Sequence, residues 1–176
     1  MTTLSAPDRT EAAEYYFTYI DQVGAGEICA LLEAQLPEML ALLREITEEQ
    51  SLLRYAPDKW SIREVLGHLN DTERLFVFRA WWFARGFDSS LPSFDQNVAI
   101  STAGANERTW SSLVEEFQAV RLATVAFFRA LPAEAWSRRG VASGYEFTVR
   151  ALAYIGVGHV THHAKILRER YLERQA

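Results

Sequence analysis

Apolar side chains recur at steps of three and four residues along four long segments of the chain. This is the period of an amphipathic α-helix, which turns one apolar stripe toward a protein core. The first segment covers residues 27–46, and its stripe consists of Ile28, Leu31, Leu32, Gln35, Leu42, Leu43 and Ile46. Pro37 lies inside this segment, where it removes a backbone donor and clashes with the preceding turn, so we expect a kinked helix.

The second helical segment starts with the sequence SIRE at residues 61–64. Ser61 can accept a hydrogen bond from the backbone of the first turn while Glu64 reaches back to the backbone of Ser61, which is the capping-box pattern. The helix is expected to continue to Arg85 and to stop at Gly86, where a left-handed backbone conformation costs little.

The third and fourth helical segments lie in the second half of the chain. The third is expected to start at Ser111 or Ser112, with Glu115 as a possible capping partner, and to end before Pro132. The fourth is expected to cover residues 148–172. Together with the first two, these segments provide four apolar stripes that need to be buried.

Strand signals are nearly absent, because the chain has no long alternating run and no Asn-Gly or Asp-Gly hairpin turn. We therefore predict an all-α protein, in which a four-helix bundle forms a single domain over residues 1–176. Residues 86–110 form an unusually long connection with two glycines and a proline. This connection could cross the bundle, so that the second and third helices run parallel, or it could cover a pocket.

Length and composition restrict the class of protein. The chain of 176 residues matches one ordinary domain, and its 49% of hydrophobic residues excludes a disordered chain. The balance of 18 Lys and Arg against 23 Asp and Glu gives a net charge of −5, without a basic block. This charge argues against nucleic-acid binding, which depends on cations that neutralise phosphates. Cys29 is the single cysteine, so no intrachain disulfide is expected.

No segment has the pattern of a membrane span or of a signal peptide. The longest strongly apolar run, LFVFRAWWFA, includes Arg79 and has about ten residues, whereas a membrane span needs about 20. The start of the chain, MTTLSAPDRTEAAEYY, lacks the basic residues and the apolar stretch of a signal peptide. We therefore expect a cytoplasmic protein that does not associate with membranes.

Three of the four histidines occur in the sequence GHVTHH, within the last predicted helix. At about 100° per residue, His159 and His163 lie on the apolar face of this helix, whereas His162 lies on the shoulder of that face. The fourth histidine, His68, belongs to the second predicted helix and can also point between helices. The sequence thus predicts three inward-facing imidazoles on two helices.

Buried imidazoles are unfavourable unless their ring nitrogens find partners. A single inward-facing histidine is most often a hydrogen-bonded core residue. Two histidines at i and i+4, with a third on another helix, can instead share one divalent ion, so we predict a metal site formed by His68, His159 and His163. Gly156 and Gly158 lie in the same helix, where glycine costs about 1 kcal/mol relative to alanine, and they indicate either a close helix contact or a pocket.

Three stretches of the sequence resemble the DinB/YfiT-like superfamily of metal-dependent enzymes: KWSIREVLGHLNDTERLFVFRA, LPSFDQN and TVRALAYIGVGHVTHHAKILRERYL. The Trp-Ser-Ile-Arg-Glu helix start followed by a histidine, and the final His-x-x-x-His, are the most specific parts. The resemblance implies a bundle in the up-down-down-up order, with the long connection as a crossover between its second and third helices. It also implies a three-histidine metal site, at His68, His159 and His163. His162 could then be a neighbour of the ligands, an alternative ligand or a surface residue.

The resemblance also implies an activity. Three protein ligands leave a coordination position for water or substrate, which is the arrangement of catalytic zinc sites. Bacillithiol S-transferases and a mycothiol-dependent maleylpyruvate isomerase belong to the superfamily, which implies an S-transferase that joins a low-molecular-weight thiol to a small electrophile. The alternatives are a hydrolase in which the ion activates water, and a non-catalytic metal-binding module of a stress response. Imidazole suits several divalent metals, of which we expect zinc or nickel; the resemblance further implies a homodimer.

Other polar residues near these motifs could assist such a site. A ligating histidine usually binds a carboxylate, carbonyl or water through its second ring nitrogen, and Glu64, Asp71 and Thr72 lie within about one turn of His68. Helix capping is the simpler role for Glu64. Three arginines could supply positive charge for the carboxylates of a thiol, or could form ordinary salt bridges: Arg79, Arg121 and Arg150. Two residues of the long connection could line a pocket: Asp95 and Gln96.

Overall fold

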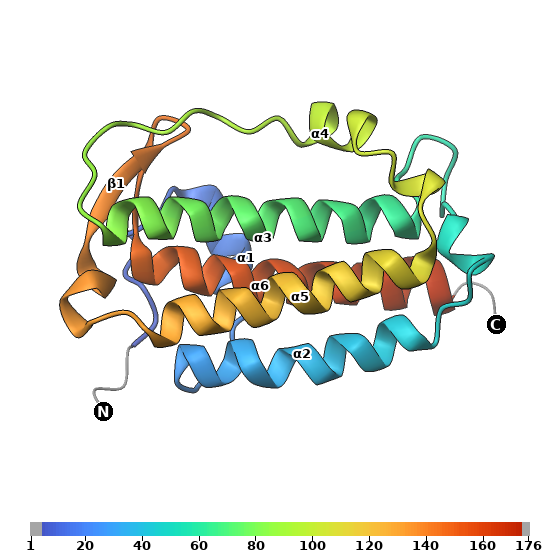
Figure 1. The fold of residues 1–176 in the computed structure, drawn as a ribbon, viewed down its shortest axis with the longest axis horizontal. Coiled ribbons are helices and arrows are strands. Elements are labelled where there is room, and N and C mark those ends of the chain that lie inside the picture. Colours follow the sequence, from blue (N-terminus) through green and yellow to red (C-terminus); the bar gives the residue numbers. More distant parts are fainter. Residues whose placement is uncertain (1–4, 174–176) are drawn as a thin grey trace.

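The computed structural model describes residues 5–173 and contains four long helices side by side (Figure 1). These are α2 (Ile28–Arg44), α3 (Ile62–Ala84), α5 (Trp110–Arg129) and α6 (Val149–Ile166). They confirm the predicted all-α class and four-helix bundle. None of the helices within residues 5–173 combines the length and the hydropathy needed to cross a membrane. The domain predicted over residues 1–176, and the start of the chain discussed above, extend beyond the described residues.

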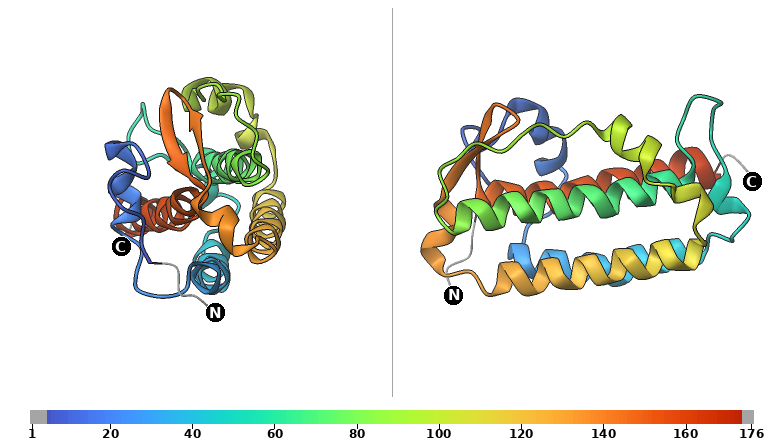
Figure 2. Two further views of the ribbon diagram at one scale, coloured as in Figure 1. Left: turned by 90° about the vertical axis from the view of Figure 1, so that its left-hand side faces the viewer. Right: turned by 45° about the horizontal axis from the view of Figure 1, so that its top comes forward.

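The helices follow the up-down-down-up order. In Figure 1, α2 and α6 run in one direction, and α3 and α5 run in the opposite direction. The chain between α3 and α5 returns along α3, as the right-hand view of Figure 2 shows, so this connection is the expected crossover. It is more ordered than a plain loop, because it contains the short helix α4 (Gln96–Thr102) and a 3₁₀ helix (Ala105–Glu107).

A short helical segment at the N-terminal end was not predicted. A 3₁₀ helix (Glu14–Tyr16) continues into α1 (Phe17–Ile20), which packs against α6. Gly158 permits this contact, because a Cβ atom at this position would lie only 2.1 Å from the carbonyl oxygen of Tyr19. A Cβ atom at Gly156 would meet no atom of residues 5–173 within 4 Å. A close helix contact therefore explains Gly158 and does not explain Gly156.

A two-stranded antiparallel hairpin precedes α6, which corrects the expectation of a chain almost without strands. Strand β1 (Arg139–Ala142) pairs with β2 (Tyr145–Thr148). The turn residues Ser143 and Gly144 have φ angles of 55° and 80°, which is the backbone that two-residue hairpin turns require. Four-residue strands are too short to show a clear alternating pattern. The N–H and C=O groups of Leu91, in the crossover, bond to the hairpin at 2.9 and 3.1 Å.

The start of α5 differs slightly from the prediction. The helix begins at Trp110, not at Ser111 or Ser112. Thr109 is its N-cap residue, and its hydroxyl group accepts a hydrogen bond from the backbone N–H of Ser112 at 3.3 Å. The capping position therefore lies two to three residues earlier, because threonine is also a favoured N-cap residue.

Two other helices have irregular features. Pro37 lies inside α2, which continues on both sides of it from Ile28 to Arg44. The last helix is extended by a π-helix (Leu167–Leu172), as far as the predicted end. The wider turn of a π-helix changes the side-chain phase. As a result Tyr171, which regular α-helical spacing would place off the apolar stripe, is buried.

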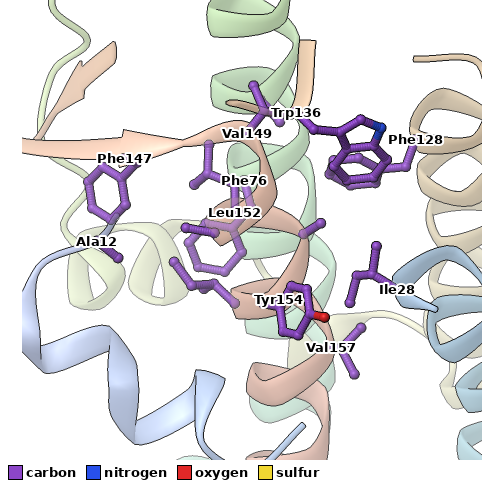
Figure 3. Close-up of a cluster of buried hydrophobic side chains, with 14 of the residues drawn as sticks. Ala12, Ile28, Phe76, Phe128, Trp136, Phe147, Val149, Leu152, Tyr154 and Val157 are labelled. Atoms are coloured by element: carbon purple, nitrogen blue, oxygen red, sulfur yellow. The ribbon is translucent and has the colours of Figure 1, made fainter. Parts of the chain in front are cut away.

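Two hydrophobic clusters fill the bundle. Figure 3 shows the first, which joins α6 to the hairpin and includes the stacked rings of Phe128 and Trp136, with centroids 5.5 Å apart. On α3, this cluster includes Phe76, and the second cluster includes Leu69. Buried or half-buried polar side chains lie between the two clusters on each of the four helices: Gln35, His68, Thr72, Glu73, Arg121, Thr124 and His159. The candidate site belongs to this polar layer.

Candidate metal centre

Helices α3 and α6 carry the three histidines to one point in the polar layer. His68 belongs to α3, and His159 and His163 belong to α6. The predicted capping box fixes where α3 begins, and so the direction in which its side chains point. In this box the Ser61 hydroxyl accepts from the N–H of Glu64, and the Glu64 carboxylate accepts from the N–H of Ser61. Helices α3 and α6 then pack together along their length.

The three imidazoles converge. One ring nitrogen from each of His68, His159 and His163 lies within 4.8 Å of the other two. The Nε2 atoms of His68 and His159 are 3.1 Å apart. The ring of His163 lies 5.1 Å from that of His68 and 4.6 Å from that of His159, measured between centroids. The packing of α3 against α6 therefore brings together the three histidines that helical periodicity predicts to face inward.

All three rings are buried, with exposed fractions of 4% for His68, 4% for His159 and 8% for His163. Desolvation by burial lowers the pKa of His68 to about 4 and is also the main cause that lowers the pKa of His163 to about 3. The pKa of His159 is lowered well below its ordinary value by burial and then by the neighbouring histidines. Near neutral pH the rings are therefore neutral, and each keeps a lone pair that can bind a metal ion.

Thr72 fixes the orientation and the tautomer of His159. Its hydroxyl group donates to the backbone carbonyl of His68 at 2.6 Å, and its oxygen lies 3.4 Å from Nδ1 of His159. Because the single hydroxyl hydrogen is engaged by the carbonyl, the oxygen acts as the acceptor toward His159. Nδ1 then carries the proton of His159, and the lone pair at Nε2 faces His68.

The expected partner for the second ring nitrogen of His68 is missing from the described residues. Nδ1 of His68 and Nδ1 of His163 have no hydrogen-bond partner there. Glu64 is occupied by the capping box and by Arg54, as its simpler role implies. Asp71 lies beside Arg74, and Thr72 serves His159 instead of His68.

The donor set fits a divalent ion. Two imidazole nitrogens that bind one ion at about 2.1 Å each are about 3.0–3.4 Å apart, because the ligand–metal–ligand angle is about 90–110°. The Nε2 atoms of His68 and His159, at 3.1 Å, agree with this spacing. A hydrogen bond between these two atoms would also agree, but it would leave the third buried ring, His163, unexplained. An ion shared by the three rings would account for the burial of all of them.

Aromatic rings surround the histidines. The ring of Tyr19 lies 5.0 Å and that of Phe76 5.8 Å from His159, and Trp60 lies 5.0 Å from His68. Tyr19 was missed because α1 was not predicted, although the aromatic sequence EYYFTYI at residues 14–20 is a signal that could have revealed a packed segment. The wall of the site thus depends on a short N-terminal helix.

A pocket of about 500 Å³ opens beside His68 and His159. Residues of the N-terminal segment and of the crossover both line it, and the crossover contributes Asp95 and Gln96, as expected. The crossover thus performs both of the roles considered for it, since it links two parallel helices and lines a pocket. Arg79 and Ser143 also line this pocket.

The remaining candidate residues lie outside the pocket lining. The half-buried ring of His162 packs 5.4 Å from Tyr19 and 5.2 Å from His163 without joining the group of three. Arg121 forms a buried two-point ion pair with Glu73, at 2.7 and 2.8 Å. Arg150 pairs with Glu11. Arg121 and Arg150 therefore form ordinary salt bridges, which was the alternative to binding the carboxylates of a thiol.

Known proteins resemble the chain in sequence and in fold. The family model of the DinB superfamily matches residues 31–167. The fold is similar to that of YfiT from Bacillus subtilis, which is described as a probable metal-dependent hydrolase with an unusual four-helix bundle topology. The TM-score is 0.72, and the two sequences are 18% identical over 96% of this chain and 91% of YfiT. The fold is also similar to that of a mycothiol-dependent maleylpyruvate isomerase, with a TM-score of 0.68 and 13% identity over 83% of this chain and 61% of the isomerase. A mutant of that isomerase matches equally well. No curated protein sequence matches the chain.

Proposed function

This chain belongs to the DinB superfamily, and from that premise we propose that it is a metal-dependent enzyme whose single divalent ion is held by His68, His159 and His163. The observation that carries the proposal is the convergence of three buried imidazoles, with ring nitrogens within 4.8 Å of one another, beside a pocket. Three ligands are one fewer than structural zinc sites usually have, so a position remains for a substrate atom. Zinc and nickel are the metals we propose.

The reaction that we propose is the transfer of a low-molecular-weight thiol to a small electrophile. A divalent ion with three neutral imidazole ligands keeps its full charge and supplies the Lewis acidity that favours the ionised form of a thiol. The pocket of about 500 Å³ has a volume typical of sites for small organic molecules. Similarity of the fold to a mycothiol-dependent enzyme supports a thiol as the co-substrate.

The residues of the chain prepare this site in two ways. Thr72 holds the ring of His159 with its Nε2 lone pair directed at the point of convergence. Tyr19, Phe76 and Trp60 cover the histidine rings with apolar surface. Such a covering excludes water and strengthens the electrostatic interactions within the site.

A metal-dependent hydrolase is the second candidate, and its support is the similarity of the fold to YfiT over nearly the whole of both chains. The two candidates differ in the nucleophile, which is a thiol in the first and water in the second. Turnover of a chloronitrobenzene that requires both the metal and an added thiol would establish the transferase. Cleavage of esters or amides by the metal-loaded protein without any thiol would establish the hydrolase instead.

Metal binding itself is tested by elemental analysis of the full chain and by titration with zinc and nickel. One equivalent of metal is expected for each chain. The variants His68→Ala, His159→Ala and His163→Ala should each weaken metal binding by at least roughly tenfold, because each removes one of three ligands. His162→Ala is the matched control, since it removes a neighbouring imidazole outside the group. Equal losses in all four variants, or no bound metal in the wild type, would refute the proposed centre.

A further inference from the structure

Arg79 is buried beside the pocket, and no carboxylate of residues 5–173 forms a salt bridge with it. The residue is only 1% exposed. Its Nη2 atom donates to the carbonyl oxygen of Pro92 at 3.1 Å and to Oγ of Ser143 at 2.9 Å, and both acceptors are neutral. Its Nε–H group has no hydrogen-bond partner among the described residues. Burial lowers the pKa of Arg79, while the phenol of Tyr16 raises it, and a guanidinium remains charged under these conditions.

The other two buried arginines are paired. Arg121 forms two hydrogen bonds with the carboxylate of Glu73, and Arg63 forms an ion pair with Glu48. Within residues 5–173, Arg79 forms no such pair. A buried charge without a partner is strongly unfavourable, so native structures usually provide an opposite charge or a bound ligand. Asp95 lines the same pocket as Arg79, but its carboxylate caps α4 by accepting from the N–H groups of Asn97 and Val98. The pocket is therefore the place from which another anion can reach Arg79.

Arg79 lies on the same side of α3 as His68, since both residues line the pocket. They are eleven positions apart, which corresponds to about 16.5 Å along the helix axis. Side chains in an α-helix lean toward its N-terminus, so the Arg79 side chain extends toward His68 and shortens this gap. Phe76 lies between the two on α3, and its ring lines the pocket together with that of Tyr16 and those of other aromatic residues. One elongated molecule can therefore contact both ends of the pocket.

We propose that Arg79 binds a carboxylate group of the substrate, and that the pocket accepts a small elongated molecule with this carboxylate at one end and an apolar or aromatic middle. The opposite, reactive end would lie at His68 and His159, which is the part of the inference that rests on the proposed function. A guanidinium binds a carboxylate with strong, charge-assisted hydrogen bonds. The bonds from Arg79 to Pro92 and Ser143 hold the guanidinium in place for this contact.

The test compares two small probes with the metal-free full chain, so that no ion can bind the carboxylate. Phenylbutyrate carries the carboxylate, and phenylbutanol is its neutral counterpart. Wild-type protein should bind phenylbutyrate roughly ten- to a hundredfold more tightly, which is the usual effect of hydrogen bonds to charged groups. The preference should be lost in Arg79→Met and retained in Ser143→Ala, which keeps the guanidinium. Equal affinities of the wild type for the two probes would overturn the inference.

A merely structural role for Arg79, as a link between the crossover and the hairpin, gives a different result. Arg79→Met would then lower the affinity for both probes by the same factor, and this result would also overturn the inference. If this variant does not fold, the Nε–H signals of the wild type in a nitrogen–proton correlation spectrum provide the answer. Phenylbutyrate should shift the signal of Arg79 and leave that of Arg121, which is paired with Glu73, unchanged. An unchanged Arg79 signal would refute the proposal.

The failure of this inference and the failure of the proposed function can be told apart. A wild-type protein that binds metal but shows no preference for phenylbutyrate over phenylbutanol would refute the role of Arg79 alone. A carboxylate preference in a protein that binds no metal would refute the metal centre and leave the anion site in place.

Discussion

The contact between α1 and α6 offers a sharp test with a matched control, because α6 contains two glycines in different surroundings. A Cβ atom at Gly158 would lie 2.1 Å from the carbonyl oxygen and 2.5 Å from the carbonyl carbon of Tyr19. A Cβ atom at Gly156 would meet none of the described atoms within 4 Å. The obstacle at Gly158 is backbone, which cannot rotate away as a flexible side chain can. The variants Gly158→Ala and Gly156→Ala should therefore have opposite effects.

The magnitudes follow from two opposing terms. Alanine is favoured over glycine inside a helix by up to about 1 kcal/mol, so Gly156→Ala should stabilise the protein by up to that amount. Overpacking costs about 1–3 kcal/mol, and the backbone clash at Gly158 places this variant at the upper end. After the helix gain is subtracted, Gly158→Ala should lower the free energy of unfolding by about 2 kcal/mol.

Thermal unfolding followed by circular dichroism measures both variants. For a domain of this size, 1 kcal/mol corresponds to about 2–4 °C in Tm. Gly156→Ala should raise Tm by up to about 2–4 °C, and Gly158→Ala should lower it by about 4–8 °C. If Gly158→Ala were as stable as Gly156→Ala, α1 could not lie against α6 as described, and Tyr19 could not form part of the wall around His159.

Three further predictions concern stability and assembly. Glu73→Ala leaves the buried guanidinium of Arg121 unpaired and should lower the free energy of unfolding in urea by about 3–5 kcal/mol. Replacing both residues by apolar ones of similar size should restore most of this loss. If the single and the double variant were equally destabilised, the pairing would be refuted. Burial alone would raise the pKa of Glu11, but hydrogen bonds, chiefly from Arg150, hold it below 4.5. The ionised Glu11 carboxylate therefore stabilises the folded state above this pH, and this stabilisation is lost as the pH falls below it. The variant Glu11→Gln should lose less free energy of unfolding than the wild type over the same acidic range. If the two proteins had the same pH profile of stability, the stabilising role of the Glu11 carboxylate would be contradicted. The homodimer expected from the family resemblance should give a mass of about 40 kDa by light scattering, twice the 20.0 kDa of one chain, and a monomer mass would exclude it.

The main elements of the fold could be predicted from local patterns. The capping box of Ser61 and Glu64 and the apolar period of four segments depend on residues a few positions apart, and the structure agrees with both. The hairpin and α1 could not be found in this way. Their segments are short, and they are stabilised by distant partners, such as the crossover at Leu91 and the surface of α6 beside Gly158. Local propensity carries little information about such contacts.

For the candidate site, the sequence by itself determined which histidines face inward, because helical periodicity fixes the direction of each side chain relative to its own helix. It did not determine that His68 would meet His159 at 3.1 Å or that Thr72 would bond to His159. It also did not determine that Arg79 would be buried without a salt bridge to any residue of the described part of the chain. Those relations depend on how α3 is placed against α6 and where the crossover and hairpin lie. Such placement arises from packing between segments far apart in the chain, so only the tertiary structure decided it.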